Sequence, residues 1–258
     1  MIEKDRYQDY SKSRDYWEIA KGLQTVDGLK TSAYLDGLVE ENLKGKKTYH
    51  EVEENLKNYH STRKDKNEDE KEADLSATRI SMLLNEPDFR LTTGELLYTH
   101  KFIFQGVFPQ EMEKYVGVIR DVNLRKEEDV LGGKSVIYTD FHRIKEYLDY
   151  DIAEENERIK KEEVAHIEHL TKFVSNIWNT HPFREGNTRT TAAFVLRYLR
   201  KYGYNVENDL FKDKSLYFRN ALVFASDNEA SIRADYSYLE SFFTKLLVDD
   251  QTQLKEMP

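Results

Sequence analysis

One stretch of nine residues constrains this chain most, because it combines a base, a carboxylate, a glycine and an arginine. It reads His181-Pro182-Phe183-Arg184-Glu185-Gly186-Asn187-Thr188-Arg189. Upstream, apolar residues recur at three- and four-residue steps, which predicts an amphipathic helix over 164–179 that ends at Pro182. The helical pattern resumes from Thr190 to Lys201. The stretch is therefore predicted to be a loop between two helices, with His181 at the end of a buried face.

The second half of this stretch has the features of a phosphate site. It runs into a helix N-terminus, where free backbone N–H groups and the helix dipole favour an anion. Gly186 lets the backbone close around that anion as a nest, and Arg189 adds a planar charged donor. A nucleotide phosphate fits this arrangement. The predicted phosphate-binding residues of the stretch are Arg184, Gly186, Asn187, Thr188 and Arg189.

Two side chains of the stretch can take part in chemistry on that phosphate. Glu185 can hold Mg²⁺ against the phosphate oxygens, since Mg²⁺ usually takes one or two carboxylates together with phosphate and water. His181, with an unperturbed pKa near ~6.5, can take the proton from an incoming hydroxyl. Glu185 is therefore the predicted metal ligand, and His181 is the predicted catalytic base.

By these residues the stretch resembles the signature of the Fic family, His-x-Phe-x-(Asp/Glu)-Gly-Asn-(Gly/Lys)-Arg-x-x-Arg. Thr188 departs from the usual Gly or Lys, and Ala192 stands where many members carry a second arginine. The resemblance extends over roughly 91–247 and is specific, because a motif of this length that joins two helices is rarely met by chance. The matching residues are His181, Phe183, Glu185, Gly186, Asn187 and Arg189.

Composition favours an all-α protein. The chain of 258 residues has only four prolines and eleven glycines, with many Leu, Lys and Glu. This length predicts one main domain and a smaller helical piece. We place the N-terminal segment at 1–60, a charged linker without apolar periodicity at 61–73 and the main Fic-type domain at 74–250. The absence of cysteine excludes disulfides and thiol catalysis.

The charge pattern argues against several kinds of partner. The net charge is −9 with both signs interspersed, which leaves no broad basic surface for a nucleic-acid backbone. The seventeen tyrosines are scattered through helical patterns, as is typical of half-buried packing residues rather than of a base-stacking surface. The N-terminus is charged, and no apolar run approaches the ~18 residues of a membrane span. We expect a cytoplasmic protein with neither a nucleic-acid nor a membrane partner.

Residues 15–59 are predicted to form three short helices. Thr31 or Ser32 can cap the second helix, and Thr48 with Glu51 has the form of a capping box for the third. A unit of about 45 residues has too little core to fold alone, so we expect it to dock on the main domain mainly through apolar surface. The three-helix pattern is also similar to the antitoxin-type segment that lies beside or is fused to many Fic domains.

That likeness raises the question of inhibition. In the family, an inhibitory helix carries (Ser/Thr)-x-x-x-Glu-(Gly/Asn), and its glutamate pairs with the second signature arginine and misplaces the γ-phosphate of ATP. Two registers are open here, one with Asp27 and one with Asp36 at the glutamate position, and only the second has a Ser/Thr residue, Ser32. Because both registers offer Asp and Ala192 removes the arginine, we expect a brake built on this ion pair to be missing.

The pattern changes to β-prone pieces between 108 and 140. Two pieces, at 117–120 and 129–139, lie around Gly132-Gly133 and predict a hairpin. In the Fic family a hairpin called the flap lies here and aligns the target by strand addition, a use that suits an exposed edge. Without the resemblance, an ordinary surface hairpin is the preferred interpretation. The implied target-binding residues are Lys134, Ser135, Val136, Ile137 and Tyr138.

Other polar residues on the predicted helices are assigned as follows. His100 is expected to be packed and hydrogen-bonded rather than a ligand. His166 and His169 lie at i and i+3, but no third metal ligand is apparent nearby, so both are expected to be solvated. Family members often line the adenine pocket from the helix that corresponds to 215–225, which implies Asn220 as a base contact.

The resemblance implies an enzyme that transfers AMP from ATP, with Mg²⁺, to a Ser, Thr or Tyr hydroxyl of a protein, its own chain included. One alternative is a nucleotide-binding interaction module with little turnover, which the departures at Thr188 and Ala192 would suit. Another is a Fic enzyme that removes AMP or transfers a different phosphate-bearing group. The signature does not decide among them, because substrate choice depends on contacts outside it.

Overall fold

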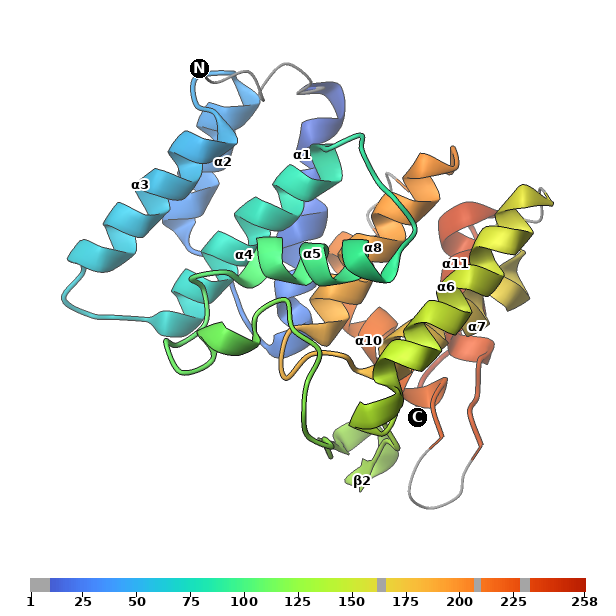
Figure 1. The fold of residues 1–258 in the computed structure, drawn as a ribbon. Helices are drawn as coiled ribbons and strands as arrows, with labels where there is room; N and C mark the ends of the chain where they lie inside the picture. Colours follow the sequence, from blue (N-terminus) through green and yellow to red (C-terminus); the bar gives the residue numbers. More distant parts are fainter. Residues whose placement is uncertain (1–9, 162–165, 207–209, 228–232) are drawn as a thin grey trace.

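The structure is a computed structural model that describes residues 10–161, 166–206, 210–227 and 233–258 (Figure 1). Within these ranges eleven α-helices and one two-stranded antiparallel sheet make up the fold, which confirms the predicted all-α class with a small hairpin. None of the described helices is long and apolar enough to cross a membrane. The helices are α1 (Tyr10–Gly22), α2 (Ala33–Leu43), α3 (Tyr49–Thr62), α4 (Glu68–Asn85), α5 (Thr93–Phe104), α6 (Ile144–Lys160), α7 (Ile167–Thr180), α8 (Asn187–Lys201), α9 (Leu210–Asp213), α10 (Ser215–Phe224) and α11 (Ser237–Leu247).

Helix α8 is the centre of the molecule. Every residue from Asn187 to Leu199 is buried, and α4, α5 and α7 all pack against this helix. A helix that is buried on all sides must find partners for its polar side chains inside the protein. Arg197, for example, lies 2.5 Å from a carboxylate oxygen of Glu95 on α5. The residues that follow the signature loop are therefore held from several directions.

Figure 1 shows α2 and α3 to the left of α4, while α1 runs behind α4 near the centre of the view. Helix α1 packs on α4 and α9, and α3 packs on α4, while α4 also contacts α5 and α8. The 3₁₀ turn η1 (Leu23–Asp27) follows α1 and contacts α8 and α10. The predicted docking of this segment on the rest of the chain is thus observed, with α4 as the shared helix.

The predicted helix caps are present, but the charged linker is shorter than expected. Ser32 accepts a hydrogen bond from Leu35 N at the start of α2, and Thr48 with Glu51 forms the capping box of α3. The structure has a helix where 68–73 was predicted to be a loop, because α4 begins at Glu68. Asn67 caps it, and three acidic residues occupy its first turn, where the helix dipole favours negative charge.

The helix before the signature loop runs from Ile167 to Thr180, and the predicted start at Val164 lies outside the described residues. The prediction that both histidines near its start are solvated is wrong for His169. That side chain lies 2.5 Å from a carboxylate oxygen of buried Glu155, which also accepts a hydrogen bond from Tyr198. His166 is exposed, as expected.

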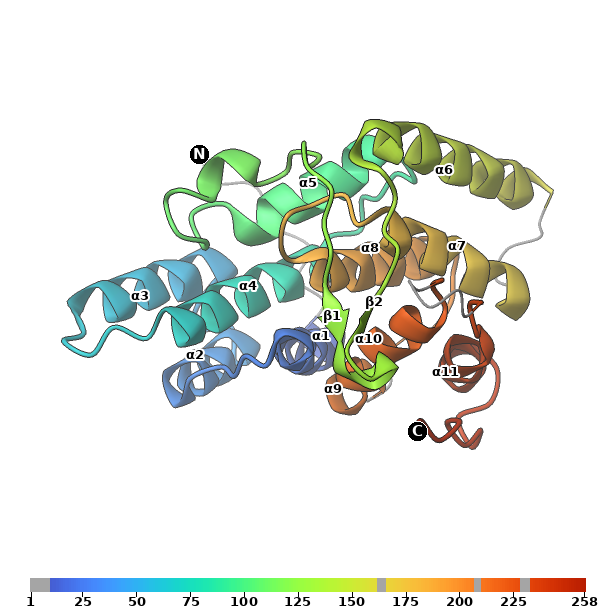
Figure 2. The same ribbon diagram turned by 90° about the horizontal axis from the view of Figure 1, so that it is seen from below.

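The hairpin consists of β1 (Glu127–Glu128) and β2 (Lys134–Ser135), paired antiparallel with Glu127 opposite Ser135. Its turn contains Gly132 and Gly133, both at positive φ, as the Gly-Gly pair predicted. The first strand was misplaced by the sequence pattern, since 117–120 is irregular. Figure 2 shows that the segments leading into and out of the hairpin pass in front of the loop that joins α7 to α8. The hairpin region contacts the signature residues there, since Lys126 Nζ donates to Glu185 and the Tyr138 ring stacks on His181.

Candidate active site

His181 ends helix α7 in a strained backbone conformation. Its N–H donates to the Trp178 carbonyl at 2.9 Å, and its φ of +45° makes it the only non-glycine residue with positive φ in the described chain. A left-handed conformation costs an L-residue roughly 1–2 kcal/mol. Pro182 follows directly and cannot continue a helix. Strain of this kind persists only where the surroundings impose it.

The His181 ring is enclosed by aromatic rings. The Tyr138 ring stacks on it with centroids 4.0 Å apart, and the Trp178 ring meets it edge-on at 5.4 Å. His181 is only 3% exposed, and neither ring nitrogen has a hydrogen-bond partner among the described residues. Burial, followed by the charges of Lys126 and Arg120, holds the pKa of His181 well below its ordinary value. The imidazole is therefore neutral at physiological pH and can accept a proton.

A buried arginine that the sequence did not single out holds the His181 peptide in place. Arg120 Nε donates to the His181 carbonyl at 2.7 Å, and the backbone N–H of Arg120 donates to the Pro182 carbonyl at 2.8 Å. A second guanidinium nitrogen donates to the Thr180 carbonyl at 3.3 Å. A single sequence carries no signal for this role, because Arg120 was assigned to a predicted strand at 117–120 and its partners at the end of α7 lie about sixty residues further along the chain.

The signature loop is closed by its own side chains. Asn187 Oδ1 accepts from Phe183 N at 2.9 Å, and Asn187 Nδ2 donates to the Phe183 carbonyl at 2.8 Å. Gly186 has a φ of +74°, and a Cβ there would lie 2.4 Å from the Phe104 ring. Phe183 is buried, as expected of a residue that anchors the loop. The predicted role of Asn187 in fixing the loop is therefore observed.

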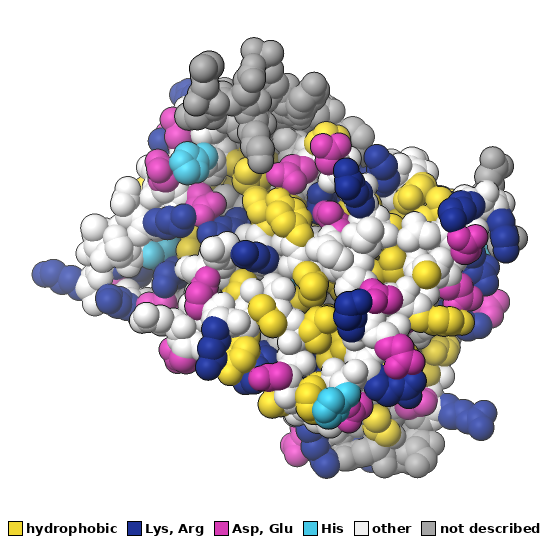
Figure 3. All heavy atoms as spheres, in the orientation of Figure 1, with side chains coloured by type: hydrophobic (Ala, Val, Ile, Leu, Met, Phe, Trp, Pro, Cys, Tyr) yellow, Lys and Arg dark blue, Asp and Glu magenta, His cyan; other side chains and the backbone are white. Residues whose placement is uncertain are grey.

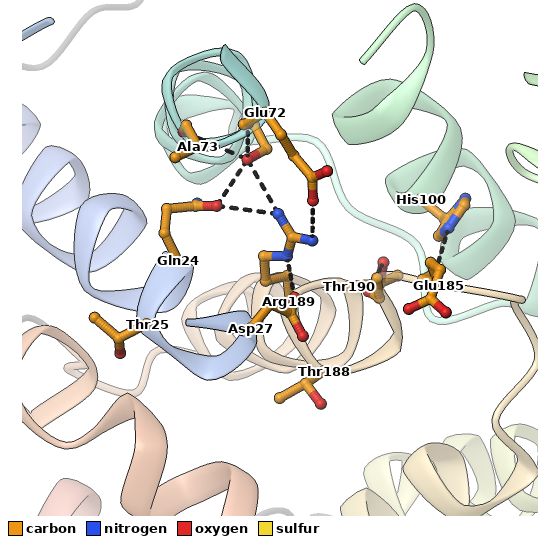
Figure 4. Close-up of polar contacts among 12 residues, drawn as sticks. Gln24, Thr25, Asp27, Glu72, Ala73, His100, Glu185, Thr188, Arg189 and Thr190 are labelled. Carbon is orange, nitrogen blue, oxygen red and sulfur yellow. Dashed lines mark hydrogen bonds and ion pairs between the residues drawn. The ribbon is translucent and has the colours of Figure 1, made fainter. Parts of the chain in front are cut away.

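His100 of α5 supports the loop from behind (Figure 4). Its Nδ1 accepts from Gly117 N at 2.8 Å, so its Nε2 carries the proton and donates to the Glu185 carbonyl at 3.0 Å. The His100 ring also stacks on Phe183 at 3.8 Å. Burial lowers the pKa of His100 to about 3. His100 is thus a packed, hydrogen-bonded histidine, as predicted.

The start of α8 offers backbone donors to an anion. Helix α8 begins at Asn187 rather than after Arg189, and the Thr190 N–H donates to the Gly186 carbonyl at 3.0 Å. The N–H groups of the residues between them precede this first bond and have no acceptor within the helix. The side chain of Thr188 turns away, since its Oγ1 accepts from Trp178 Nε1 at 3.0 Å. Any phosphate held here would be bound by the backbone at this position.

Glu185 is the exposed residue of the signature loop. Its carboxylate is half exposed, and Lys126 Nζ lies 3.1 Å from Oε2. A single accessible carboxylate beside a helix N-terminus fits Mg²⁺ that arrives with a nucleotide. Among the described residues, no cluster of three or more His, Cys, Asp or Glu can hold a metal ion.

Arg189 is not free to contact a ligand, because partners on η1 and α4 surround its guanidinium (Figure 4). Nε lies 2.7 Å from Asp27 Oδ2, and one terminal nitrogen lies 2.6 Å from Glu72 Oε1. The other terminal nitrogen donates to Gln24 Oε1 at 3.1 Å and to Ser76 Oγ at 3.3 Å. All three guanidinium nitrogens are thus engaged within the protein.

This arrangement gives a carboxylate of the N-terminal segment a partner other than the second signature arginine, which Ala192 replaces. Asp27 pairs with Arg189, the first arginine of the signature, and so the register that lacks the Ser/Thr is the one that reaches the site. The other register lies elsewhere: Asp36 pairs with Lys21 at 2.7 Å, and Ser32 caps α2. The absence of a brake stays a prediction.

The structure also shows the contacts of Arg184 and Asn220 and the burial of Ala192. Arg184 donates to Asp121 Oδ1 at 2.5 Å and lies over the Tyr115 ring at 3.6 Å from its centroid. Asn220 is half-buried on α10, and its Oδ1 accepts from Arg219 at 3.2 Å. Ala192 is fully buried in α8. The roles assigned to Arg184 and Asn220 in nucleotide binding remain predictions.

The predicted target-binding residues of the hairpin divide into two groups. Ser135, Val136 and Tyr138 are buried, whereas Lys134 and Ile137 are exposed. The exposed fraction of Ile137 is 54%, which is large for an apolar side chain. Ser135 and Val136 are neighbours and both buried, so the segment does not alternate strictly as a strand with one packed face would.

Two contacts hold the hairpin against α10 and the segment after it. Glu128 is buried and forms an ion pair with Arg219 of α10, while the Tyr138 hydroxyl donates to Glu128 at 3.5 Å. The Ile137 N–H donates to the Asp227 carbonyl at 3.1 Å. The Ile137 N–H, which a target strand could otherwise pair with, is therefore already bonded within the chain.

The fold and site define a class of protein: an all-α bundle in which the loop between two helices presents a buried histidine beside a glycine-lined helix N-terminus. A model of the Fic/DOC family matches residues 90–199, a range that includes the hairpin, α7 and the signature loop. The match supports assignment of this part of the chain to the Fic family. The N-terminal helices lie outside the matched range, so their likeness to an antitoxin segment remains a prediction. Comparisons with curated proteins and with solved structures gave no match.

Proposed function

We propose that this protein transfers AMP from ATP to a Ser, Thr or Tyr hydroxyl of a protein. The observation that carries the proposal is the state of His181, a buried neutral imidazole with two unpartnered nitrogens on the loop that leads into α8. An unpartnered buried polar group costs free energy and is retained mainly where it has a task. Proton acceptance from a nucleophile is such a task.

In the proposed reaction, the hydroxyl oxygen of the target attacks the α-phosphorus of ATP. The new bond joins that oxygen to the phosphorus, the bond to the β-phosphate oxygen breaks, and pyrophosphate leaves. His181 accepts the hydroxyl proton as the oxygen becomes nucleophilic. A base of this kind typically contributes ~10²–10⁴ in rate.

The backbone at the start of α8 would bind the phosphates. Its first N–H groups and the positive end of the helix dipole stabilise negative charge that develops there. Asn187 keeps these groups in place through its two hydrogen bonds to Phe183. Mg²⁺ beside Glu185 would neutralise phosphate charge when it is bound. Lys126, now paired with Glu185, would have to yield that carboxylate to the metal.

A protein rather than a nucleic acid is the proposed target. Charged side chains of both signs are scattered over the face in Figure 3, so this face presents no extended basic surface for a nucleic-acid backbone. The described chain also exposes large apolar side chains near the hairpin in sequence, among them Val118, Val122 and Ile137. Exposed apolar side chains next to a strand edge suit contact with an extended peptide segment.

A nucleotide-binding module with little turnover is the second candidate, and two observations favour it. The Tyr138 ring covers His181, and all the guanidinium nitrogens of Arg189 are engaged by the protein itself. A target hydroxyl reaches His181 only if Tyr138 moves aside. Binding without transfer would follow if the hairpin stayed closed.

Label position distinguishes these functions. Protein incubated with ATP and Mg²⁺ is expected to retain label from the α-phosphate and none from the γ-phosphate. Label from the γ-phosphate would indicate kinase-type transfer instead, and retention of neither label together with saturable ATP binding would support the second candidate. His181→Ala serves as the matched control, since it removes the base and leaves the α8 N-terminus intact.

A further inference from the structure

The guanidinium of Arg120 contacts two parts of the chain that are far apart in sequence. On one side it donates to the carbonyls of Thr180 and His181, at the end of α7. On the other side it donates to the carbonyls of Val122 and Thr139, each at 2.5 Å. Val122 lies where the chain enters the hairpin and Thr139 where the chain leaves it, and we call these two residues the feet of the hairpin. One side chain therefore joins the candidate base to both feet of the hairpin.

The chemistry of this contact is unusual for a buried cation. Arg120 is 2% exposed, and every hydrogen bond that its guanidinium makes with a described residue goes to a backbone carbonyl. Two of those carbonyls belong to the C-terminal end of α7, where the helix dipole carries partial negative charge. The planar fork of donors on arginine can serve several acceptors at fixed angles, which the ammonium of lysine cannot do.

We propose that Arg120 is a positioning residue that fixes the His181 peptide and both feet of the hairpin in one geometry. The inference rests on the proposed role of His181 as the base. It gives a reason for the positive φ of His181, since the carbonyl of that residue must point at Arg120 Nε. It also explains how the Tyr138 ring comes to lie on the base, because Tyr138 immediately precedes the foot at Thr139.

The positive charges around His181 provide a second test of the proposal, through the pH dependence of the reaction rate. Lys126, Arg120 and Arg219 all lower the pKa of His181 electrostatically, and the neutral Tyr138 ring covers it. Removal of the Arg120 charge should raise the pKa of His181, so the acid limb of a pH–rate profile should move to higher pH. A residue that served only the stability of the fold would leave that limb in place.

The experiment compares Arg120→Met and Arg120→Lys with Arg79→Met. Arg79 is a suitable control, since it is also buried and donates to two backbone carbonyls, those of Ile103 and Gln105, but contacts neither α7 nor the hairpin. Each variant is treated with diethyl pyrocarbonate, which modifies accessible imidazole nitrogens, and the modified histidines are quantified by mass spectrometry. The exposed His142 is the internal reference.

His181 is expected to be protected in the wild type and in Arg79→Met. In Arg120→Met its modification rate should rise about tenfold or more, and Arg120→Lys should lie between, because an easier local opening exposes a buried group in proportion to its population. Equal protection of His181 in Arg120→Met and Arg79→Met would overturn the proposal. If Arg120→Met does not fold, Arg120→Lys decides in the same way.

Label transfer from ATP is measured in parallel. Arg120→Lys, which keeps the positive charge, is expected to lower kcat about tenfold or more with nucleotide affinity unchanged within about twofold, whereas Arg120→Met should also shift the acid limb to higher pH. Unchanged kcat in Arg120→Lys together with an unchanged acid limb in Arg120→Met would contradict the positioning role. If no variant and no wild-type sample transfers label, the proposed function fails, and the modification rates of His181 still decide whether Arg120 holds the base and hairpin together.

Discussion

Arg189 and Asp27 form an ion pair across the junction of the two parts of the chain, with 2.7 Å between Nε and Oδ2. The arginine comes from the first turn of α8 and the aspartate from the last position of η1. Glu72 of α4 contacts the same guanidinium. A signature residue assigned to phosphate binding thus also holds three elements together.

Asp27→Asn should destabilise the protein by about 1 kcal/mol, because the buried guanidinium loses one of its two carboxylates. The value is at the low end because Asp27 is partly exposed and its pair is screened by solvent. Asp36→Asn is the matched control, as its pair with Lys21 is more exposed and should contribute less than ~0.5 kcal/mol. Urea unfolding measures the free energy of unfolding of both variants. An equal decrease in the two would show that the Asp27 pair contributes no more to stability than an exposed ion pair.

His181→Ala should abolish label transfer while ATP affinity stays within a few-fold. The imidazole acts on the hydroxyl of the target, whereas the phosphates are held by the α8 backbone, and loss of a general base costs ~10²–10⁴ in rate. Titration calorimetry for ATP and a transfer assay measure the two quantities. Transfer at the wild-type rate would remove His181 from the mechanism.

Gly186→Ala should destabilise the protein by ~2–4 kcal/mol, because the new Cβ meets the Phe104 ring in a left-handed conformation. Gly37→Ala in α2 should do the opposite and stabilise by up to ~1 kcal/mol, since nothing lies within 4 Å of its Cβ position and its φ is ordinary. Thermal melts of both variants test the contrast. Similar melting temperatures for both would contradict the close approach of Phe104.

The lowered pKa of His100 should make the free energy of unfolding depend on pH. Its pKa is about 3 in the folded protein but near ~6.5 in the unfolded chain, so the unfolded state binds more protons between these values. Stability therefore falls as pH drops below ~6.5, by up to ~1.4 kcal/mol per pH unit from this residue. His100→Gln should be less stable at neutral pH but show a shallower loss on acidification. Identical slopes for variant and wild type would indicate that His100 is solvated.

Lys126→Met should lower the Mg²⁺ concentration needed for nucleotide binding by up to about fivefold. The ammonium now lies 3.1 Å from Glu185 and competes with the metal for that carboxylate, and an exposed pair of this kind is worth ~0.2–1 kcal/mol. Glu185→Ala should have the reverse effect and weaken Mg²⁺-dependent binding. Titrations of Mg²⁺ at fixed ATP measure both, and an unaltered Mg²⁺ requirement in Glu185→Ala would exclude it as a ligand.

The sequence predicted the helices well because their signals are local. Apolar spacing located α7 and α8, and Ser32 and Thr48 located two helix starts through caps that act within four residues. The position of the hairpin turn also followed from Gly132 and Gly133. The first strand was misplaced, because a strand of two residues, Glu127–Glu128, has no periodicity to detect.

The candidate site was predictable only where its residues are neighbours in the chain. His181, Glu185 and Gly186 lie on one loop, so their proximity needs no tertiary information. Arg120 and the Asp27 pair depend on contacts between distant segments, and a single sequence does not encode such pairings in a local pattern. The prediction that His169 is solvated was wrong for the same reason, since its partner Glu155 lies on another helix.

The short loop at 63–67 has a consequence for how the chain behaves when it is cut. Helices α1 to α3 precede this loop, and α4, against which α1 and α3 pack, follows it. Cleavage beside Lys64 would leave Arg189 and Asp27 on different fragments that still share a buried core. The two pieces should thus behave as a split protein, co-eluting in size-exclusion chromatography and reassembling after separation in denaturant, while the larger piece alone would expose the apolar face of α4.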